Sequence, residues 1–163
     1  MIHISTGPAD PGEILIKFPE YAKTINGERC VPEIRLSRPT TPSRKAAEME
    51  AWRMVPVPNQ DESDEDFAAR AQPVLAALGF DTVVKSAGLE SGLQAAAQTL
   101  DLVKLVQLHI LGWKHFGDAK SKQVVEPTAM AVQALIIGHP TVAKKIEREI
   151  NRALGQVVRE GNG

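Results

Sequence analysis

Apolar side chains recur at steps of three and four residues from Leu89 to Phe116, the longest stretch of this chain with one consistent period. This spacing places them on one face of a helix. Between Leu100 and Leu111 apolar residues surround most of the helix, a pattern typical of a helix covered on more than one side. We therefore expect a central helix over residues 89–116. Its apolar middle is either part of the core of this domain or a face that binds a partner.

Four further segments have helical patterns, at residues 43–54, 63–78, 127–137 and 140–159. In the second, Ser63 is a good N-cap and Asp66 follows three residues later, as in a capping box. The last segment carries the clearest apolar stripe, which consists of Val142, Ile146, Ile150, Ala153, Leu154 and Val157. Residues 80–88 are a connector or one more helical turn. Short connections between the later helices favour antiparallel neighbours.

Residues 1–41 are rich in Pro and Gly and contain three short apolar groups, near Ile2, Ile14 and Ile34. The alternation of apolar and polar residues predicts short strands, and Asn26-Gly27 favours a tight hairpin turn. Such a sheet is marginal by itself. This part is either a small sheet or a loosely ordered extension.

Together these patterns predict a mainly α fold, with a compact helical domain of about five helices and an extended or small β N-terminal part. Pro-rich breaks near residues 39–42 and 56–58 divide the chain into three segments. These are an N-terminal arm of residues 1–41, a helix and Pro-rich linker of residues 42–60, and a helical domain of residues 61–160.

Charge and composition narrow the classes of function. The 163 residues include 19 basic and 20 acidic ones, for a net charge of −1. A general nucleic-acid binder usually carries a basic excess, so we expect no nucleic-acid partner. The central apolar segment is too often interrupted by polar residues to span a membrane. The first residues do not resemble a signal peptide, which favours the cytoplasm.

Residues able to do chemistry are few and scattered. The single cysteine, Cys30, has no neighbouring base, and no two histidines stand four residues apart. Gly88 and Gly92 lack the lysine of a phosphate-binding loop. The acidic run at residues 61–66 lacks the ligand spacing of a calcium loop and is read as a solvated helix start. We therefore predict no catalytic residue, no metal, no cofactor and no enzymatic activity.

An ordered set of motifs lies between residues 105 and 150. It consists of Ile110-Leu111-Gly112-Trp113-Lys114-His115-Phe116, a polar turn at Gly117-Asp118, Val124-Val125-Glu126-Pro127-Thr128, an apolar helix from Met130 to Ile137, and His139-Pro140-Thr141-Val142-Ala143. This set resembles the small tail assembly chaperones of long-tailed, siphovirus-like bacteriophages. The turn departs from the usual Asp-Gly order, and residues 1–41 have no counterpart in the pattern.

The resemblance implies a non-enzymatic helical protein of the host cytoplasm that binds the tape measure protein. It would keep that protein soluble during tail assembly and help to recruit tail tube subunits. Candidate partner-binding residues are Trp113, Ile146, Ile150 and Leu154, and a homo-oligomer is compatible with the sequence. The stripe of the last helix is alternatively core. Trp113 is either an anchor whose indole N–H bonds a carbonyl, or a contact hot spot.

Two other functions stay open at this point. One is a structural virion component, a neck or tail-completion protein whose N-terminal arm adds a strand to a neighbouring subunit. The other is a helical DNA-binding regulator. It would use the four basic residues between Lys144 and Arg152, which are interleaved with Glu147 and Glu149.

Overall fold

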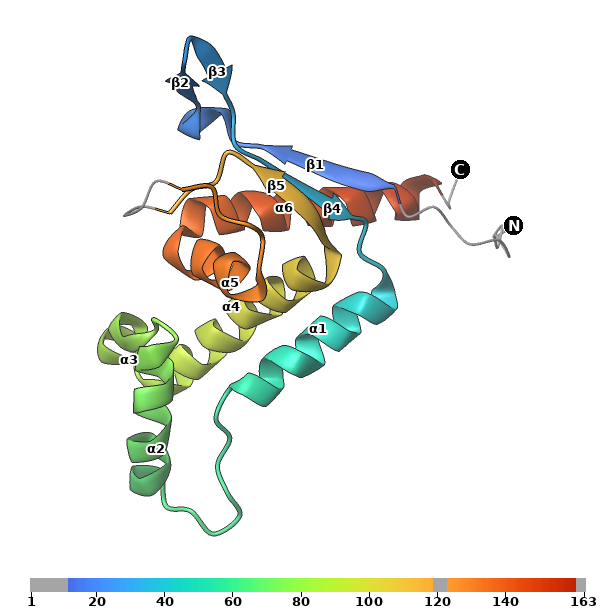
Figure 1. Cartoon of the computed structure of the whole chain (residues 1–163). Coiled ribbons are helices and arrows are strands. Elements are labelled where there is room, and N and C mark those ends of the chain that lie inside the picture. Colours follow the sequence, from blue (N-terminus) through green and yellow to red (C-terminus); the bar gives the residue numbers. More distant parts are fainter. Residues whose placement is uncertain (1–11, 119–122, 161–163) are drawn as a thin grey trace.

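A computed structural model describes residues 12–118 and 123–160, the last five of these through their backbone only. In chain order the strands are β1 (Glu13–Lys17), β2 (Lys23–Ile25), β3 (Glu28–Cys30), β4 (Glu33–Ser37) and β5 (Ile110–Lys114). The helices are α1 (Thr41–Met54), α2 (Asp64–Ala77), α3 (Asp81–Ala87), α4 (Leu89–His109), α5 (Ala129–Gly138) and α6 (Pro140–Glu160), and a 3-10 turn, η1, covers Pro19–Tyr21. The fold is mainly α, as the sequence predicts (Figure 1).

Three strands form one antiparallel sheet in the order β1-β4-β5. The register pairs Ile14 with Leu36 and Ile16 with Ile34. These four side chains are buried on the same face of the sheet. Strands β2 and β3 form a separate hairpin, and its turn residues Asn26 and Gly27 have φ values of 52° and 82°. Positive φ at both positions is what a two-residue hairpin turn requires, so the predicted Asn-Gly turn is confirmed.

The helices divide between two hydrophobic clusters. The larger cluster joins the buried face of the sheet to α4, α5 and α6, and contains Val103, Val132, Ile146 and Ile150. The smaller cluster joins α1, α2 and the first half of α4. In Figure 1, α1 runs beside α4, and α6 lies against the sheet. Strands β1 and β4 therefore share a core with the helices, whereas the β2–β3 hairpin lies outside it.

The N-cap that the sequence predicts for α2 is confirmed, and a glycine cap follows the other end of the helix. Ser63 accepts a hydrogen bond from the amide of Asp66 at the start of the helix. At the other end Gly79 has a φ of 89°, the amide of Phe80 donates to Leu75 and the amide of Gly79 donates to Ala76. This pair of bonds is the Schellman motif. Pro73 lies inside α2, and the helix continues for four residues beyond it to Ala77.

The predicted central helix is wrong at its C-terminal end. Helix α4 ends at His109, and the following residues form β5, which pairs with β4 at Ile34↔Trp113. Local periodicity did not reveal this strand because its partner lies more than 70 residues earlier in the chain. Residues 81–87 form a sixth helix where the sequence left a connector or a turn. The predicted strand near Ile2 lies outside the described residues.

One smaller difference concerns the start of α5. Helix α5 begins at Ala129, with Thr128 as its N-cap, so that Pro127 lies before the helix instead of in its first turn. Among the described helices, none is both long enough and apolar enough to cross a bilayer.

Candidate partner-binding surface

The predicted contact residues of α6 lie in the core. Ile146 is 0% exposed and Ile150 is 1% exposed, because the apolar stripe of α6 faces the sheet. Leu154 is partly buried against the same cluster. The sequence prediction that Ile146 and Ile150 bind a partner is therefore wrong. The sequence pattern of an amphipathic helix is the same whether its apolar stripe packs in the core or binds another protein. A partner cannot reach these two side chains in this conformation.

Trp113 anchors the turn that follows β5. Its indole N–H donates to the carbonyl oxygen of Val125. Its ring stacks on Phe116 at 4.9 Å between centroids and 28° between planes, and Phe116 meets Phe18 edge to face. Of the two interpretations of Trp113, the anchor with its N–H on a carbonyl is the one that the contacts support. The half-buried ring therefore holds Phe116 and Val125 next to the end of β5.

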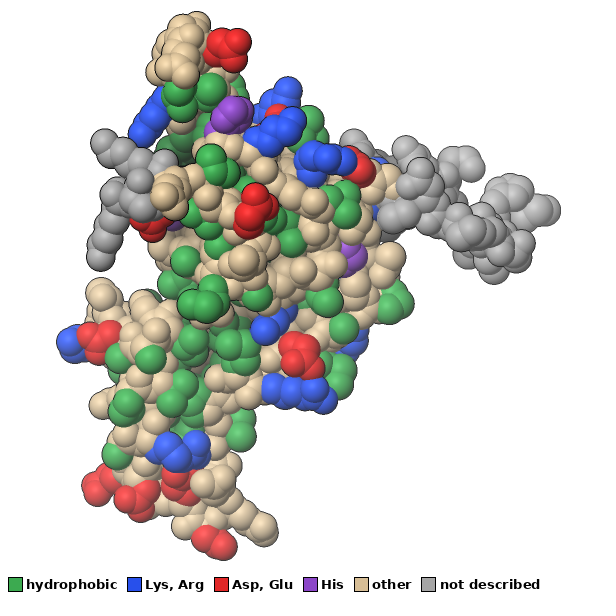
Figure 2. Space-filling view, in the orientation of Figure 1, with side chains coloured by type: hydrophobic (Ala, Val, Ile, Leu, Met, Phe, Trp, Pro, Cys, Tyr) green, Lys and Arg blue, Asp and Glu red, His purple; other side chains and the backbone are tan. Residues whose placement is uncertain are grey.

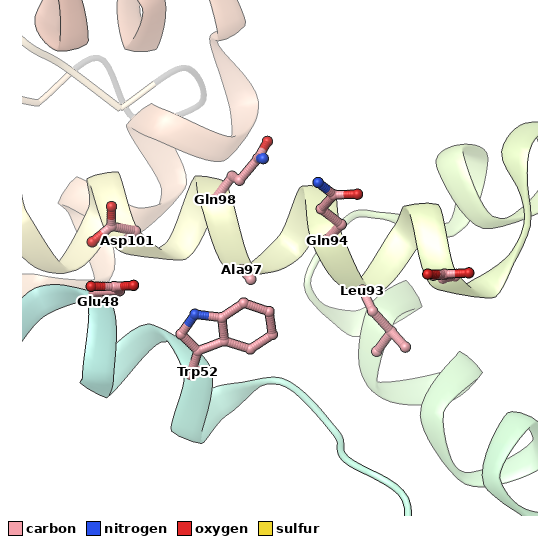
Figure 3. Close-up of a pocket in the computed structure, with 8 residues that line it drawn as sticks. Glu48, Trp52, Leu93, Gln94, Ala97, Gln98 and Asp101 are labelled. Carbon is pink, nitrogen blue, oxygen red and sulfur yellow. The ribbon is translucent and has the colours of Figure 1, made fainter.

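An open groove with an exposed aromatic side chain lies between α1 and α4. Trp52 is 51% exposed, and its indole extends across the space between the two helices beneath Ala97 (Figure 3). Leu93 lines the groove further along α4. The groove has a volume of about 530 Å³. We call the eight residues that line it the α1–α4 groove: Glu48, Trp52, Glu90, Leu93, Gln94, Ala97, Gln98 and Asp101.

Small residues explain why Trp52 stands at the edge of the contact between α1 and α4. Ala47 and Ala51, four residues apart on α1, are fully buried against the rest of the fold. Residues at this spacing lie on one helical face, and alanine allows two helices to approach closely. Trp52 follows Ala51 and is rotated about 100° away from that face. The indole therefore covers the rim of the α1–α4 contact while one side stays open to solvent.

Every charged side chain that lines the groove is a carboxylate: Glu48, Glu90 and Asp101. Glu48 forms an ion pair with Lys45 at 2.8 Å, whereas Glu90 and Asp101 form none within the described part of the chain. Burial raises the pKa of Asp101, Arg44 counteracts the rise, and Glu48 adds to it. The groove thus combines an apolar floor with an acidic rim that a cation would complement.

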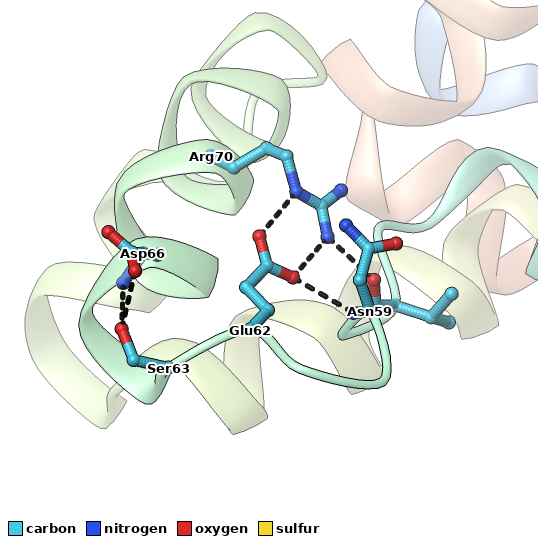
Figure 4. A network of polar contacts seen from close by, with 6 residues as sticks. Asn59, Glu62, Ser63, Asp66 and Arg70 are labelled. Carbon is cyan, nitrogen blue, oxygen red and sulfur yellow. Dashed lines mark hydrogen bonds and ion pairs between the residues drawn. The ribbon is translucent and has the colours of Figure 1, made fainter.

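A polar network fixes the loop that connects α1 to α2. Glu62 accepts hydrogen bonds from Nε and Nη2 of Arg70 at 2.8 and 2.7 Å, and from the backbone amide of Asn59 at 2.9 Å (Figure 4). Arg70 also donates to the carbonyl of Val57 at 2.7 Å. The hydrogen bonds from Arg70, which have the largest effect, and from the amide of Asn59 lower the pKa of Glu62 to about 2. The loop beyond Trp52 is therefore held to α2.

Acidic side chains gather at the same end of the molecule. Figure 2 shows Asp and Glu at the lower end, where Figure 1 places the loop and the first turn of α2. This turn contains Asp64, Glu65 and Asp66. Acidic residues in a first turn stabilise the helix through its dipole, so the cluster has a structural explanation.

His109 links α4 to β4 and α1, at the end where α1 begins. Its Nδ1 lies 2.8 Å from Oγ of Ser37, at the end of β4, and its Nε2 lies 2.7 Å from Oγ of Ser43, in α1. Ser43 also bonds Thr40 in the capping box that starts α1. Burial lowers the pKa of His109. The imidazole is therefore part of the contact between β4, α1 and the end of α4.

The sequence pattern indicates the exposed face of α1 that contains Trp52. Ala46, Met49 and Trp52 share a helical face at steps of three residues. The structure places that face outward, with all three residues exposed. What the pattern did not reveal is that α4 supplies Leu93 and the carboxylates next to Trp52.

No group of three or more His, Cys, Asp or Glu side chains within the described residues is arranged to hold a metal ion. Comparison with known protein families, with curated proteins and with solved structures found no match to this chain.

Proposed function

We propose that this protein is a phage tail assembly chaperone that binds an amphipathic helix of the tape measure protein in the α1–α4 groove. It acts in the host cytoplasm, keeps the tape measure protein soluble and helps to recruit tail tube subunits. The observation that carries the proposal is Trp52, half exposed in an open groove whose charged lining consists of carboxylates.

The groove favours a helix with both apolar and basic residues. Tryptophan is among the residue types most enriched at binding hot spots. Amphipathic helices bind hydrophobic grooves through residues spaced three and four apart. Lys or Arg on the flanks of such a helix would meet Glu90 and Asp101, neither of which has an ion-pair partner within the described residues. Apolar contact supplies affinity, and the charges supply orientation.

The choice of the tape measure protein as the partner rests on the resemblance between residues 105 and 150. In the fold these residues run from the second half of α4 through β5 and α5 into α6. A long rod-like protein with apolar helix faces needs cover until it is assembled, because exposed apolar patches aggregate. A small protein that offers an exposed tryptophan in a groove with an acidic rim suits that task.

The test is co-expression with the tape measure protein of the same phage, followed by affinity purification. We expect a soluble complex, whereas the tape measure protein alone is expected to be insoluble. Glu90→Lys reverses a charge in the groove and should reduce the yield of complex. Glu28→Lys makes the same charge change on the exposed strand β3 and should leave the yield unchanged.

Two results would overturn the proposal. One is a tape measure protein that gains no solubility and does not co-purify. The other is the presence of this protein in purified mature virions in stoichiometric amount, which indicates the structural virion component instead. Equal yields with Glu90→Lys and Glu28→Lys would leave a chaperone whose binding surface is elsewhere.

A further inference from the structure

The outer edge of β1 is unpaired among the described residues. Strand β1 is the first strand of the order β1-β4-β5, so it has a neighbour on one side only (Figure 1). Backbone bonds next to the strand run from Arg38 to Gly12 and from Phe18 to Pro32. Bonding in an antiparallel pair alternates along the strand, so Ile14 and Ile16 bond toward β4. The N–H and C=O groups of Glu13, Leu15 and Lys17 then point away from the sheet.

The three residues on this edge form a self-complementary pattern. Glu13 and Lys17 have opposite charges and stand at equal distances from Leu15, which is 52% exposed. Within one copy the carboxylate of Glu13 already pairs with Arg35 of β4 at 2.9 Å, so Lys17 of the other copy would join an existing ion pair. Two copies of β1 that pair antiparallel about Leu15 would place each Glu13 opposite the Lys17 of the other copy. The central pair would be Leu15 with Leu15. All three pairs would exchange two backbone hydrogen bonds each.

Charges on the exposed face of the sheet continue this pattern. Lys114 forms an ion pair with Glu33 at 3.0 Å, and Glu33 lies opposite Lys17 in the register. A second copy would add its Glu13 beyond Lys17, so that basic and acidic residues alternate across the joined sheets. Opposite charges directly across two strands stabilise the pair, and like charges destabilise it.

Edge strands usually carry charges that prevent pairing. Here the two charges stand in the order that allows the strand to pair with itself, and the residue between them is apolar. We propose that β1 is a dimerisation edge and that its partner is β1 of a second copy of this chain, which joins two three-stranded sheets into one. This inference does not depend on the α1–α4 groove or on its partner.

The test uses two single charge reversals and their mixture. Lys17→Glu leaves two acidic residues on the edge, and Glu13→Lys leaves two basic ones, so each variant places like charges opposite each other in a dimer. We expect the dissociation constant of each variant dimer to be about tenfold or more above that of the wild type by analytical ultracentrifugation. An equimolar mixture of the two variants restores both opposite-charge pairs and should form a mixed dimer.

A structural defect in either variant would not be repaired by mixing, and circular dichroism checks that each one folds. A second readout is hydrogen exchange of the Leu15 amide. It should slow as protein concentration rises, whereas the Ile16 amide, bonded to Ile34, should stay protected at every concentration. A wild-type protein that stays monomeric throughout the concentration series, or a mixture that does not dimerise, overturns the proposal. So does an unchanged Leu15 exchange rate.

Discussion

Nε2 of His109 lies 2.7 Å from the hydroxyl oxygen of Ser43 and so joins the end of α4 to the first turn of α1. Nδ1 of the same ring bonds Ser37 at the end of β4. One imidazole thus links the sheet to both helices that form the groove. Helices α1 and α4 are held at this end by hydrogen bonds and along their length by small apolar residues.

The position of His109 predicts a pH dependence of stability. Burial lowers its pKa in the folded state below the ordinary value of 6.5. The unfolded chain therefore takes up a proton first, so the contribution to stability is present above about pH 6.5 and is lost as the pH falls below it. His109→Asn should flatten this part of the profile. The measurement is the urea midpoint of unfolding from neutral to mildly acidic pH.

Ser37→Ala serves as the control for this prediction, since it removes the hydrogen bonds of the Ser37 hydroxyl to Nδ1 and to the carbonyl oxygen of His109 and keeps the imidazole. It should lower stability by about 1 kcal/mol at neutral pH and retain the slope with pH. A His109→Asn profile as steep as that of the wild type would show that His109 does not titrate as described.

Glu62 should titrate near pH 2 in the folded protein, because Arg70 and the amide of Asn59 hydrogen-bond its carboxylate. A lowered folded-state pKa stabilises the fold above the ordinary value of 4.5, and this contribution disappears as the pH falls toward 2. NMR titration of the side-chain carboxyl measures the pKa directly. Arg70→Gln should return the value toward 4.5, and Arg70→Lys should return it only in part. A wild-type value near 4.5 would mean that the loop network does not form.

Gly92 is required by the close approach of α4 to α3. A Cβ at this position would overlap Cγ2 of Val84 and lie 3.4 Å from Cδ1 of Leu75. Gly92→Ala should lower the free energy of unfolding by about 1–3 kcal/mol, the usual cost of overpacking. Adding Val84→Ala makes room and should recover most of the loss. Gly155→Ala, at an open helical site, should instead stabilise the protein by about 0.5–1 kcal/mol. Equal changes in the free energy of unfolding for Gly92→Ala and Gly155→Ala would contradict the close packing of α4 on α3 at Gly92.

Trp113→Phe separates the hydrogen bond of the anchor from its ring stacking. The variant loses the bond to the carbonyl of Val125 and keeps a ring against Phe116. We expect a loss of about 1 kcal/mol in the free energy of unfolding. Trp52→Phe, at a half-exposed ring, should change stability by less than about 0.5 kcal/mol. Denaturant unfolding measures the free energy of unfolding of both variants. A Trp113→Phe variant as stable as the wild type would show that the indole N–H does not contribute to stability.

Features set by nearby residues could be predicted from the sequence. The Asn26-Gly27 turn, the cap at Ser63 and the stripe of α6 depend on residues within a few positions of one another. Features that join distant segments could not. Strand β5 depends on β4, the two serines bonded by His109 lie 66 and 72 residues away, and the groove depends on Trp52 of α1 lying beneath Ala97 of α4. The direction in which α6 faces is also a tertiary property, and so Ile146 and Ile150 were assigned to a partner.

The central claim is that the α1–α4 groove binds the tape measure protein through Trp52. The most direct measurement is the affinity of a soluble tape measure fragment for wild type, Trp52→Ala and Met130→Ala, by isothermal titration calorimetry. Met130 is 84% exposed on α5 and serves as an apolar control outside the groove. We expect Trp52→Ala to raise Kd by about 30-fold or more, as for a hot-spot residue, and Met130→Ala to leave it within about twofold. Equal affinity of Trp52→Ala and the wild type would contradict the claim.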